Sequence, residues 1–221
     1  MQKIIVALDG FSGTGKSSTA KMVAERLGYT YIDSGAMYRA VTYHFLRNHI
    51  DIEDKSEVKK ALNDCSISFK PAGLYLNNEL VEDKIRSMEV SRQVSQVSAI
   101  SEVRKKLVEQ QRIMGSEKGV VMDGRDIGTV VFPEAELKLF MTADMDVRAR
   151  RRSKQLAEKG IKEDIDMIRK NLEARDKMDS SRSDSPLVKA GDAIEIDTSG
   201  LTLNQQVDKI VELAEKIIYE H

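Results

Sequence analysis

The amino-acid sequence predicts an α/β protein built on a five-stranded parallel sheet that is wrapped by helices. Continuous apolar runs, typical of strands buried on both faces of a sheet, alternate along the chain with stretches of helical periodicity. Strands and helices that alternate in this way favour a doubly wound sheet. With 221 residues, the chain is long enough to bury one sizeable core.

The apolar runs and the helical stretches follow one another in a regular order. The strands of the parallel sheet are expected at residues 4–9, 29–32, 120–123, 137–141 and 193–197. Helices are expected up to Gly28, a C-terminal stop signal, and then around 37–45, about 146–159, about 164–178 and after Thr202. Thr202 and Gln205 have the spacing of a capping box. A polar, helix-like stretch runs from about 87 to 116.

The pattern changes after about residue 62. Short alternating segments at 67–69, 74–76 and 80–81 are separated by Pro71-Ala72-Gly73 and by Asn77-Asn78, both of which are good turn sequences. These segments predict a small antiparallel sheet inserted into the α/β chain.

The composition excludes several classes of protein. Lys and Arg number 35 against 36 Asp and Glu, so the chain lacks the broad basic field that nucleic acid attracts. A single cysteine, Cys65, rules out a disulfide framework and a cysteine-rich zinc site. No apolar window approaches the ~18 residues needed to span a membrane, so we expect a cytoplasmic protein with no membrane partner. The histidines, His44, His49 and His221, form no metal-binding pattern.

The strongest functional signal follows the first strand. Residues 10–17, Gly-Phe-Ser-Gly-Thr-Gly-Lys-Ser, match the P-loop pattern between an apolar strand and an amphipathic helix. The glycines let backbone N–H groups surround a phosphate, and the helix directs its positive dipole end at the phosphate. Lys16 is expected to reach the outer phosphates of ATP and Ser17 to bind Mg²⁺.

Arginines follow two other predicted strands. Arg125 and Asp126 come directly after the strand at 120–123, and Ser34 and Arg39 come after the strand at 29–32. Ligands of open α/β sheets bind at the carboxyl ends of the strands, so these side chains are candidates for a second binding site. Each lone arginine could equally be a solvated surface residue. Asp123 could bind the metal ion or only turn the chain.

These motifs together resemble the bacterial cytidylate kinases in their long form. The resemblance runs from about residue 3 to 218, and it rests on residues 10–18, 33–39, 95–97 and 123–133 and on Arg175-Asp176, Asp179 and Arg182. It implies the fold of P-loop NTPases with an inserted NMP-binding lobe, which contains the small antiparallel sheet, and a helical lid. A single kinase domain would comprise a core (about 1–33, 100–145 and 185–221), the lobe (about 34–99) and the lid (about 146–184).

The resemblance also implies a role for each matching position. Residues Gly10, Phe11, Ser12, Gly13, Thr14, Gly15, Lys16, Ser17, Ser18 and Arg151 would bind ATP, with Ser17 and Asp123 at the metal ion. CMP would be bound by Ser34, Tyr38, Arg39, Ser95, Arg104, Gly124, Arg125, Asp126, Arg175, Asp179 and Arg182. The catalytic residues would be Lys16, Arg39, Arg125, Arg148 and Arg152, with the last two in the lid.

The expected reaction is in-line transfer of the γ-phosphoryl group of Mg-ATP to CMP or dCMP. The phosphate of a nucleoside monophosphate is largely dianionic near pH 7, so the reaction needs no general base. Other acceptors, such as UMP, AMP or a hydroxylated metabolite, remain open, as does an ATP-sensing regulator without catalytic activity. Because no long apolar stripe compels a dimer, a monomer is expected.

Overall fold

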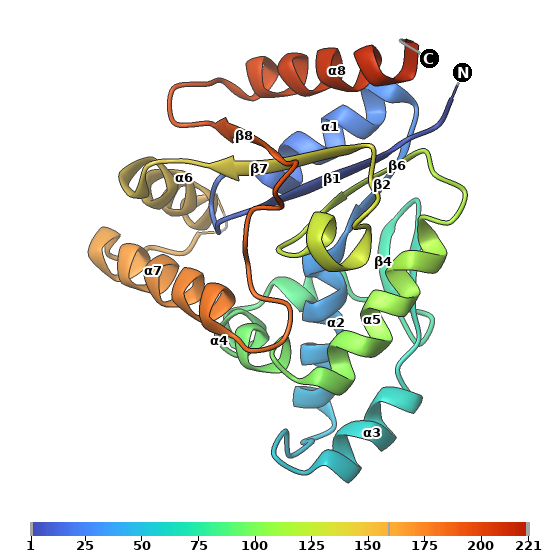
Figure 1. The fold of residues 1–221 in the computed structure, drawn as a ribbon. Helices are drawn as coiled ribbons and strands as arrows, with labels where there is room; N and C mark the ends of the chain where they lie inside the picture. The colour runs from blue at the N-terminus through green and yellow to red at the C-terminus, as the bar shows by residue number, and fades with distance from the viewer. Residues whose placement is uncertain (1, 159, 220–221) are drawn as a thin grey trace. The chain divides into compact units, whose positions relative to one another are not determined.

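The structure, a computed structural model, describes residues 2–158 and 160–219, which divide into two compact units (Figure 1). Of these residues, unit 1 comprises 2–32, 114–158 and 160–219, and unit 2 comprises 33–113. Helices and strands are numbered along the chain. His221, one of the three histidines considered above, lies outside the described residues.

Unit 1 is built on a five-stranded sheet in the order β2-β6-β1-β7-β8. Its strands are β1 (Ile5–Gly10), β2 (Thr30–Asp33), β6 (Val120–Asp123), β7 (Leu137–Thr142) and β8 (Ile194–Asp197). Strand β1 runs parallel to β6 and to β7, and β7 runs parallel to β8. All six residues of β1 are buried, which explains why its sequence is a continuous apolar run. The prediction of a five-stranded parallel sheet is confirmed.

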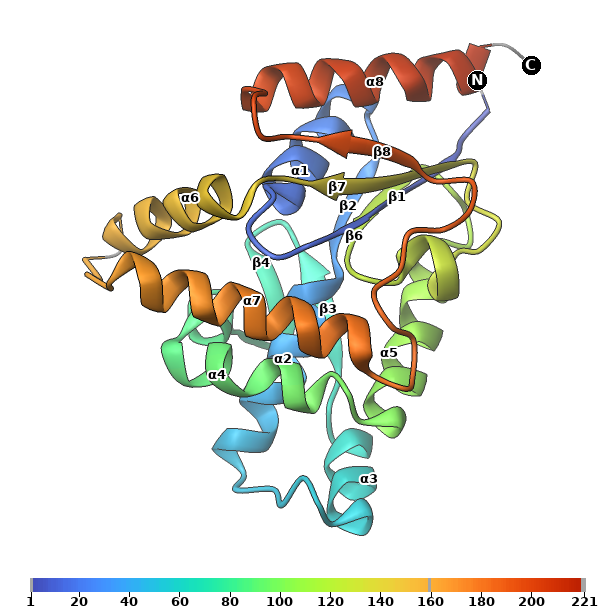
Figure 2. The same ribbon diagram turned by 60° about the vertical axis from the view of Figure 1, so that its left-hand side comes forward.

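The helices of unit 1 begin and end where the sequence indicated. Helix α1 (Lys16–Leu27) ends at Gly28, which has a left-handed backbone (φ 67°). Helix α8 (Leu203–Tyr219) begins with the capping box, in which Thr202 N and Gln205 N each donate to the other residue's side chain. Helices α6 (Met145–Ala157) and α7 (Ile165–Ser181) form a helical hairpin (Figure 2).

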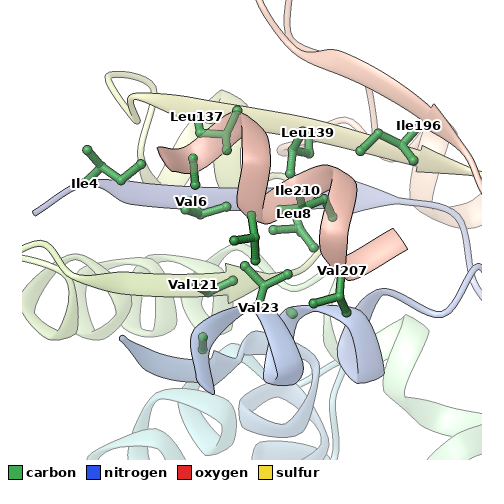
Figure 3. Packing of buried hydrophobic residues seen from close by; sticks show 14 of the residues in the cluster. Ile4, Val6, Leu8, Val23, Val121, Leu137, Leu139, Ile196, Val207 and Ile210 are labelled. Carbon is green, nitrogen blue, oxygen red and sulfur yellow. The ribbon is translucent and has the colours of Figure 1, made fainter. Parts of the chain in front are cut away.

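The core of unit 1 lies where α1 and α8 pack on the sheet (Figure 3). Val6 and Leu8 of β1, Val23 of α1 and Val207 and Ile210 of α8 are completely buried there. Burial of one such side chain contributes about 1.5–3 kcal/mol relative to leaving it exposed. This packing fixes the carboxyl end of β1, from which the phosphate-binding loop starts.

Unit 2 contains the small antiparallel sheet with the strands β3 (Ile67–Lys70), β4 (Gly73–Leu76) and β5 (Glu79–Leu80) in that order. Asn77 and Asn78, which join β4 to β5, both have positive φ angles (49° and 66°). Asparagine tolerates this left-handed backbone better than most residues, which explains the turn. The predicted inserted sheet is therefore confirmed.

The helices of unit 2 differ from expectation in two places. The helices are α2 (Ser34–Arg47), α3 (Lys55–Asn63), η1 (Lys84–Arg86), α4 (Met88–Val97) and α5 (Ser101–Met114). The helix-like stretch at 87–116 is two helices, because Ser98 caps the end of α4 and three residues separate it from α5. Helix α3 was not predicted, although the Asp54 carboxylate caps it by accepting from Ser56 N and Glu57 N.

Across residues 2–158 and 160–219, no helix combines the length and the apolar character needed to cross a bilayer.

Candidate active site

The phosphate-binding loop joins β1 to α1. Gly10, Gly13 and Gly15 have φ angles of 142°, 79° and 96°, which side chains rarely tolerate. Gly10 also lies against the neighbouring strand, since a Cβ atom there would stand 2.1 Å from Met141 O. The loop conformation therefore requires glycines at these positions, as the sequence pattern implied.

Lys16 is the first residue of α1, directly after Gly15, whose position lacks a side-chain cap. A helix start of this kind leaves backbone N–H groups available to a phosphate. The Lys16 ammonium group is buried and donates to Phe11 O (2.5 Å) and to Thr14 Oγ1 (3.4 Å) in the same loop. Burial, and then the positive charge of Arg125, lower the pKa of Lys16 to about 7. A bound polyphosphate would favour the charged form.

Ser17 and Asp123 are joined by a hydrogen bond. The Ser17 hydroxyl donates to Asp123 Oδ2 (2.9 Å), and the Tyr31 hydroxyl donates to Asp123 Oδ1 (2.8 Å). Hydroxyl and carboxylate oxygens are the ligands that Mg²⁺ prefers, and Mg²⁺ is usually held by one or two protein groups together with substrate phosphates. The part of the chain that the structure describes contains no cluster of three or more His, Cys, Asp or Glu side chains that could hold a metal ion. Ser17 and Asp123 thus fit a metal that arrives with a nucleotide.

A turn of π-helix, η2 (Ile127–Val131), follows β6. It is recognised by hydrogen bonds from Val131 N to Asp126 O (3.1 Å) and from Phe132 N to Ile127 O (2.7 Å). Such turns are rare and occur frequently at functional sites. This one lies within the segment 123–133 that carried most of the resemblance, and the sequence alone did not reveal it.

Arg125, between β6 and η2, connects the phosphate-binding loop to helix α7. Its guanidinium group donates to Ser12 Oγ (2.8 Å) and to Asp179 Oδ2 (2.9 Å). Charge-assisted hydrogen bonds of this kind are about twice as strong as neutral ones. The structure therefore places Arg125 beside the loop, at the edge of the sheet where ligands were expected.

Arg148 of α6 is held against the same loop. It donates to Ser12 O (3.2 Å) and to the Asp176 carboxylate, and it lies 5.4 Å from the centre of the Phe11 ring. Asp176 in turn accepts from Ser12 N (3.1 Å). Both helices of the α6–α7 hairpin thus bind the loop at Ser12.

Three further arginines of this hairpin, Arg151, Arg152 and Arg175, are half-buried. Arg151 donates to Thr14 O (3.0 Å) and to Thr198 O (2.7 Å), which connects the loop to the end of β8. Burial, and then the nearby charge of Arg125, lower the pKa of Arg175 to about 10. The buried Nε of Arg175 finds no hydrogen-bond partner among the described residues. Like charges packed this closely favour the binding of an anion. For Arg152, burial likewise lowers the pKa.

Asp126, Asp179 and Arg182 form a buried charged group in unit 1. Arg182 NH2 lies 3.8 Å from Asp126 Oδ1, and Arg182 NH1 lies 3.8 Å from Asp179 Oδ1. Arg182 Nε donates to Ser185 O (2.6 Å). The carboxylate of Asp179 is therefore shared between Arg182 and Arg125.

The candidate residues of unit 2 lie on three of its helices. Arg39 of α2 donates to Ser91 Oγ (3.0 Å) on α4. Arg104 of α5, which is 2% exposed, lies 5.3 Å from the centre of the Tyr38 ring and donates to Ser98 O (3.0 Å). The Ser98 hydroxyl in turn donates to Ser95 O (2.9 Å). Ser34 is buried at the start of α2.

Within each unit, the structure thus brings the predicted site residues together. The side chains that sequence reasoning missed are those that hold them: Asp9, Asp176 and Thr198. Thr198 is completely buried and donates to Thr14 O (3.0 Å). Two histidines have no place in the site: His44 lies against Ala61 O, and His49 follows the end of α2 with φ 52°.

Comparison with known proteins gives a consistent result. The sequence profile of the cytidylate kinase family matches residues 6–216. A cytidylate kinase of Cytophaga hutchinsonii is 54% identical over 220 residues, which are 97% of this chain and 94% of that protein. A cytidylate kinase of Flavobacterium psychrophilum is 51% identical over 98% of this chain and 100% of its own. Among solved structures, an uncharacterized protein from Eubacterium ventriosum shares the fold, with a TM-score of 0.51, 16% identity and full coverage of both chains.

Proposed function

Because this chain belongs to the cytidylate kinase family, we propose that it transfers the γ-phosphoryl group of ATP to CMP and dCMP. The products are ADP with CDP or dCDP. The observation that carries the proposal is the position of Arg125, which bonds the phosphate-binding loop at Ser12 and α7 at Asp179. Binding of ATP by the loop does not require an arginine from outside the loop. Transfer of a phosphoryl group to a second phosphate requires additional positive charge, which Arg125 can supply.

The proposal assigns residues 10–18 and Arg151 to ATP. Backbone N–H groups at the start of α1 bind the phosphates, and Lys16 neutralises the outer ones. Ser17 and Asp123 would hold the Mg²⁺ of Mg-ATP, and the ion would supply positive charge that offsets the charge of the phosphates. Arg148 and Arg152 of α6 contribute further positive charge where the transferred group becomes most anionic.

The proposal assigns a second set of residues to CMP. Arg39 and Arg125 bind its phosphate, with Tyr38 and Gly124 beside them. The cytosine ring is recognised by Ser34, Arg104, Asp126 and Arg182. The sugar is held by Ser95, Arg175 and Asp179. A carboxylate such as that of Asp126 accepts from the exocyclic amino group of cytosine, which uracil lacks.

The chemistry that these residues supply is electrostatic. The second pKa of a phosphate monoester is about 6, so the attacking oxygen of CMP is already ionised near pH 7. The remaining obstacle is the repulsion between two polyanions, which the lysine and the arginines reduce. Water competes as an acceptor, so we propose that the helices α6 and α7 act as a lid that excludes it. The proposed enzyme is a cytoplasmic monomer.

A substrate panel tests the proposal. The purified protein is assayed for ADP release from Mg-ATP with CMP, dCMP, UMP, AMP or gluconate as acceptor. We expect the highest kcat/KM with CMP and dCMP. A strong preference for another acceptor would contradict the assignment of cytosine. Stoichiometric ATP binding without any acceptor-dependent ADP release would instead indicate a sensor.

A further inference from the structure

Asp9 is the last side chain of β1 before the phosphate-binding loop, and it is 5% exposed. Its Oδ1 accepts a hydrogen bond from Ile127 N and its Oδ2 accepts one from Gly128 N, both at 2.8 Å. Each carboxylate oxygen therefore faces a backbone donor. The ionised form accepts both bonds most strongly, since a bond to a charged group contributes about 1.5–3 kcal/mol.

The two backbone donors stand where the pairing of β1 with β6 ends. The last pair of the register is Leu8 with Asp123, and one more backbone bond runs from Gly124 N to Leu8 O (2.9 Å). Beyond it the chain leaves the sheet as η2, so the next bonds between the two segments come from the Asp9 side chain. Beyond the paired residues of β1 and β6, the Asp9 carboxylate thus supplies the hydrogen bonds between the two segments.

We propose that Asp9 is a positioning residue for phosphoryl transfer, which holds Arg125 and Asp126 in place relative to the phosphate-binding loop. Asp9 precedes the first glycine of the loop, and the amides that it binds follow Asp126 directly. The inference rests on the proposed function, which gives Arg125 the acceptor phosphate and Asp126 the cytosine ring.

The surroundings of Asp9 leave little room for another arrangement. A Cβ atom on Gly128 would stand 3.5 Å from Asp9 Oδ2 and 3.3 Å from the Lys138 side chain. The Lys138 ammonium group is directed to Asp192 Oδ2 (2.7 Å) and to Pro133 O. The charges of Asp126 and Lys16 also act on Asp9. The segment 127–128 is therefore closely packed between Asp9 and Lys138.

The substitution Asp9→Asn tests this role, since it keeps the size of the side chain but turns an NH₂ group towards one backbone N–H. We expect kcat/KM for CMP to fall about 100-fold, as expected for a displacement near 1 Å, while KM for ATP stays nearly unchanged. In NMR spectra, the amide resonances of Ile127 and Gly128 should shift, and both amides should exchange faster with solvent.

Glu136→Gln is the matched control. The Glu136 carboxylate accepts from Ile5 N (2.9 Å) at the other end of the same strand, away from the phosphate-binding loop. The glutamine oxygen can still accept from Ile5 N, so this variant removes a carboxylate charge and the ion pair with Lys118 while it keeps the backbone bond. We expect slightly lower stability with unchanged CMP kinetics. If Asp9→Asn does not fold, Gly128→Ala is the second variant, since it perturbs the bond between Gly128 N and Asp9 from the Gly128 side. We expect a smaller fall in kcat/KM for CMP, again with a nearly unchanged KM for ATP.

Equal losses towards ATP and CMP, or unchanged CMP kinetics with shifted amide resonances, would overturn the positioning role. Failure of the proposed function gives a different result: the wild-type protein would then phosphorylate neither CMP nor dCMP in the substrate panel. The two proposals are thus separated by the behaviour of the wild-type protein.

Discussion

The two units hold their arginines with different partners. In unit 1, carboxylates hold three of them: Arg125 bonds Asp179, Arg148 bonds Asp176, and Arg182 lies between Asp126 and Asp179. Within unit 2, Arg39 bonds the Ser91 hydroxyl, and Arg104 bonds Ser98 O and lies over the Tyr38 ring. In unit 1, carboxylates thus bind three arginines, while within unit 2 a hydroxyl, a carbonyl and an aromatic ring contact two.

This difference has a consequence for ligand binding. An arginine that is paired with a carboxylate must share or exchange its partner when a phosphate arrives, so it is suited to a charge that changes during the reaction. An aromatic ring and a carbonyl fix the orientation of an arginine without adding a negative charge beside it. We therefore expect substitution of Arg125 to affect mainly turnover, and substitution of Arg104 to affect mainly the binding of the monophosphate.

The largest effect is expected for Arg125→Ala. The variant lacks the positive charge beside Ser12, so kcat should fall roughly 100- to 1,000-fold. The dissociation constant for ATP, measured by calorimetry, should change little, because the backbone of residues 10–17 is intact. Arg26→Ala, which removes an exposed arginine of α1 paired with Asp208, is the control for the lost charge. Near-normal turnover of Arg125→Ala would contradict the proposed role of Arg125 in phosphoryl transfer.

A smaller effect is expected for Arg104→Lys. A lysine cannot stack on the Tyr38 ring and donate to Ser98 O with the same planar group, so KM for CMP should rise about tenfold with little change in kcat. Steady-state kinetics at saturating ATP measure both constants. The control is Arg112→Lys, at an exposed position of the same helix. A fall in kcat alone would show that unit 2 does more than bind the acceptor.

A last prediction concerns the dependence of stability on pH. Burial raises the pKa of Asp9 to about 7, although its bonds to Gly128 N and Ile127 N act in the opposite direction. Between about pH 4 and pH 7 the folded state then holds a proton that the unfolded state has lost, so the Asp9 contribution to stability falls as pH rises. Urea unfolding at several pH values measures this slope. We expect a flatter profile for Asp9→Asn; an unchanged profile would show that Asp9 is ionised throughout this range.

Sequence reasoning succeeded where the signal is local. All five strands of the parallel sheet were predicted to within a residue at each end, because strands buried on both faces must be continuously apolar. Helix α3 was missed although its signal was available, since Asp54 and Glu57 have the spacing of a capping pattern. The break between α4 and α5 contains neither Gly nor Pro, so it could not be predicted from the sequence.

The connections within the site could not have been predicted in the same way. Asp9 binds Gly128 across 119 positions of the chain, and Ser12 binds Asp176 across 164. No periodicity relates such residues, since the fold alone brings them together. The residues proposed to touch ligands belong to recognisable motifs. Asp9 stands beside such a motif, and Asp176 lies within one but was given no role from the sequence.

Glycine is required at the first position of the phosphate-binding loop for a reason unrelated to any ligand. Gly10 is paired with Met141 of β7, and the Met141 carbonyl oxygen occupies the space that a side chain on Gly10 would need. Alanine at position 10 would therefore separate two central strands before it disturbed any nucleotide. Even in a protein with this sheet that no longer bound nucleotide, the packing of β1 against β7 would still require glycine at this position.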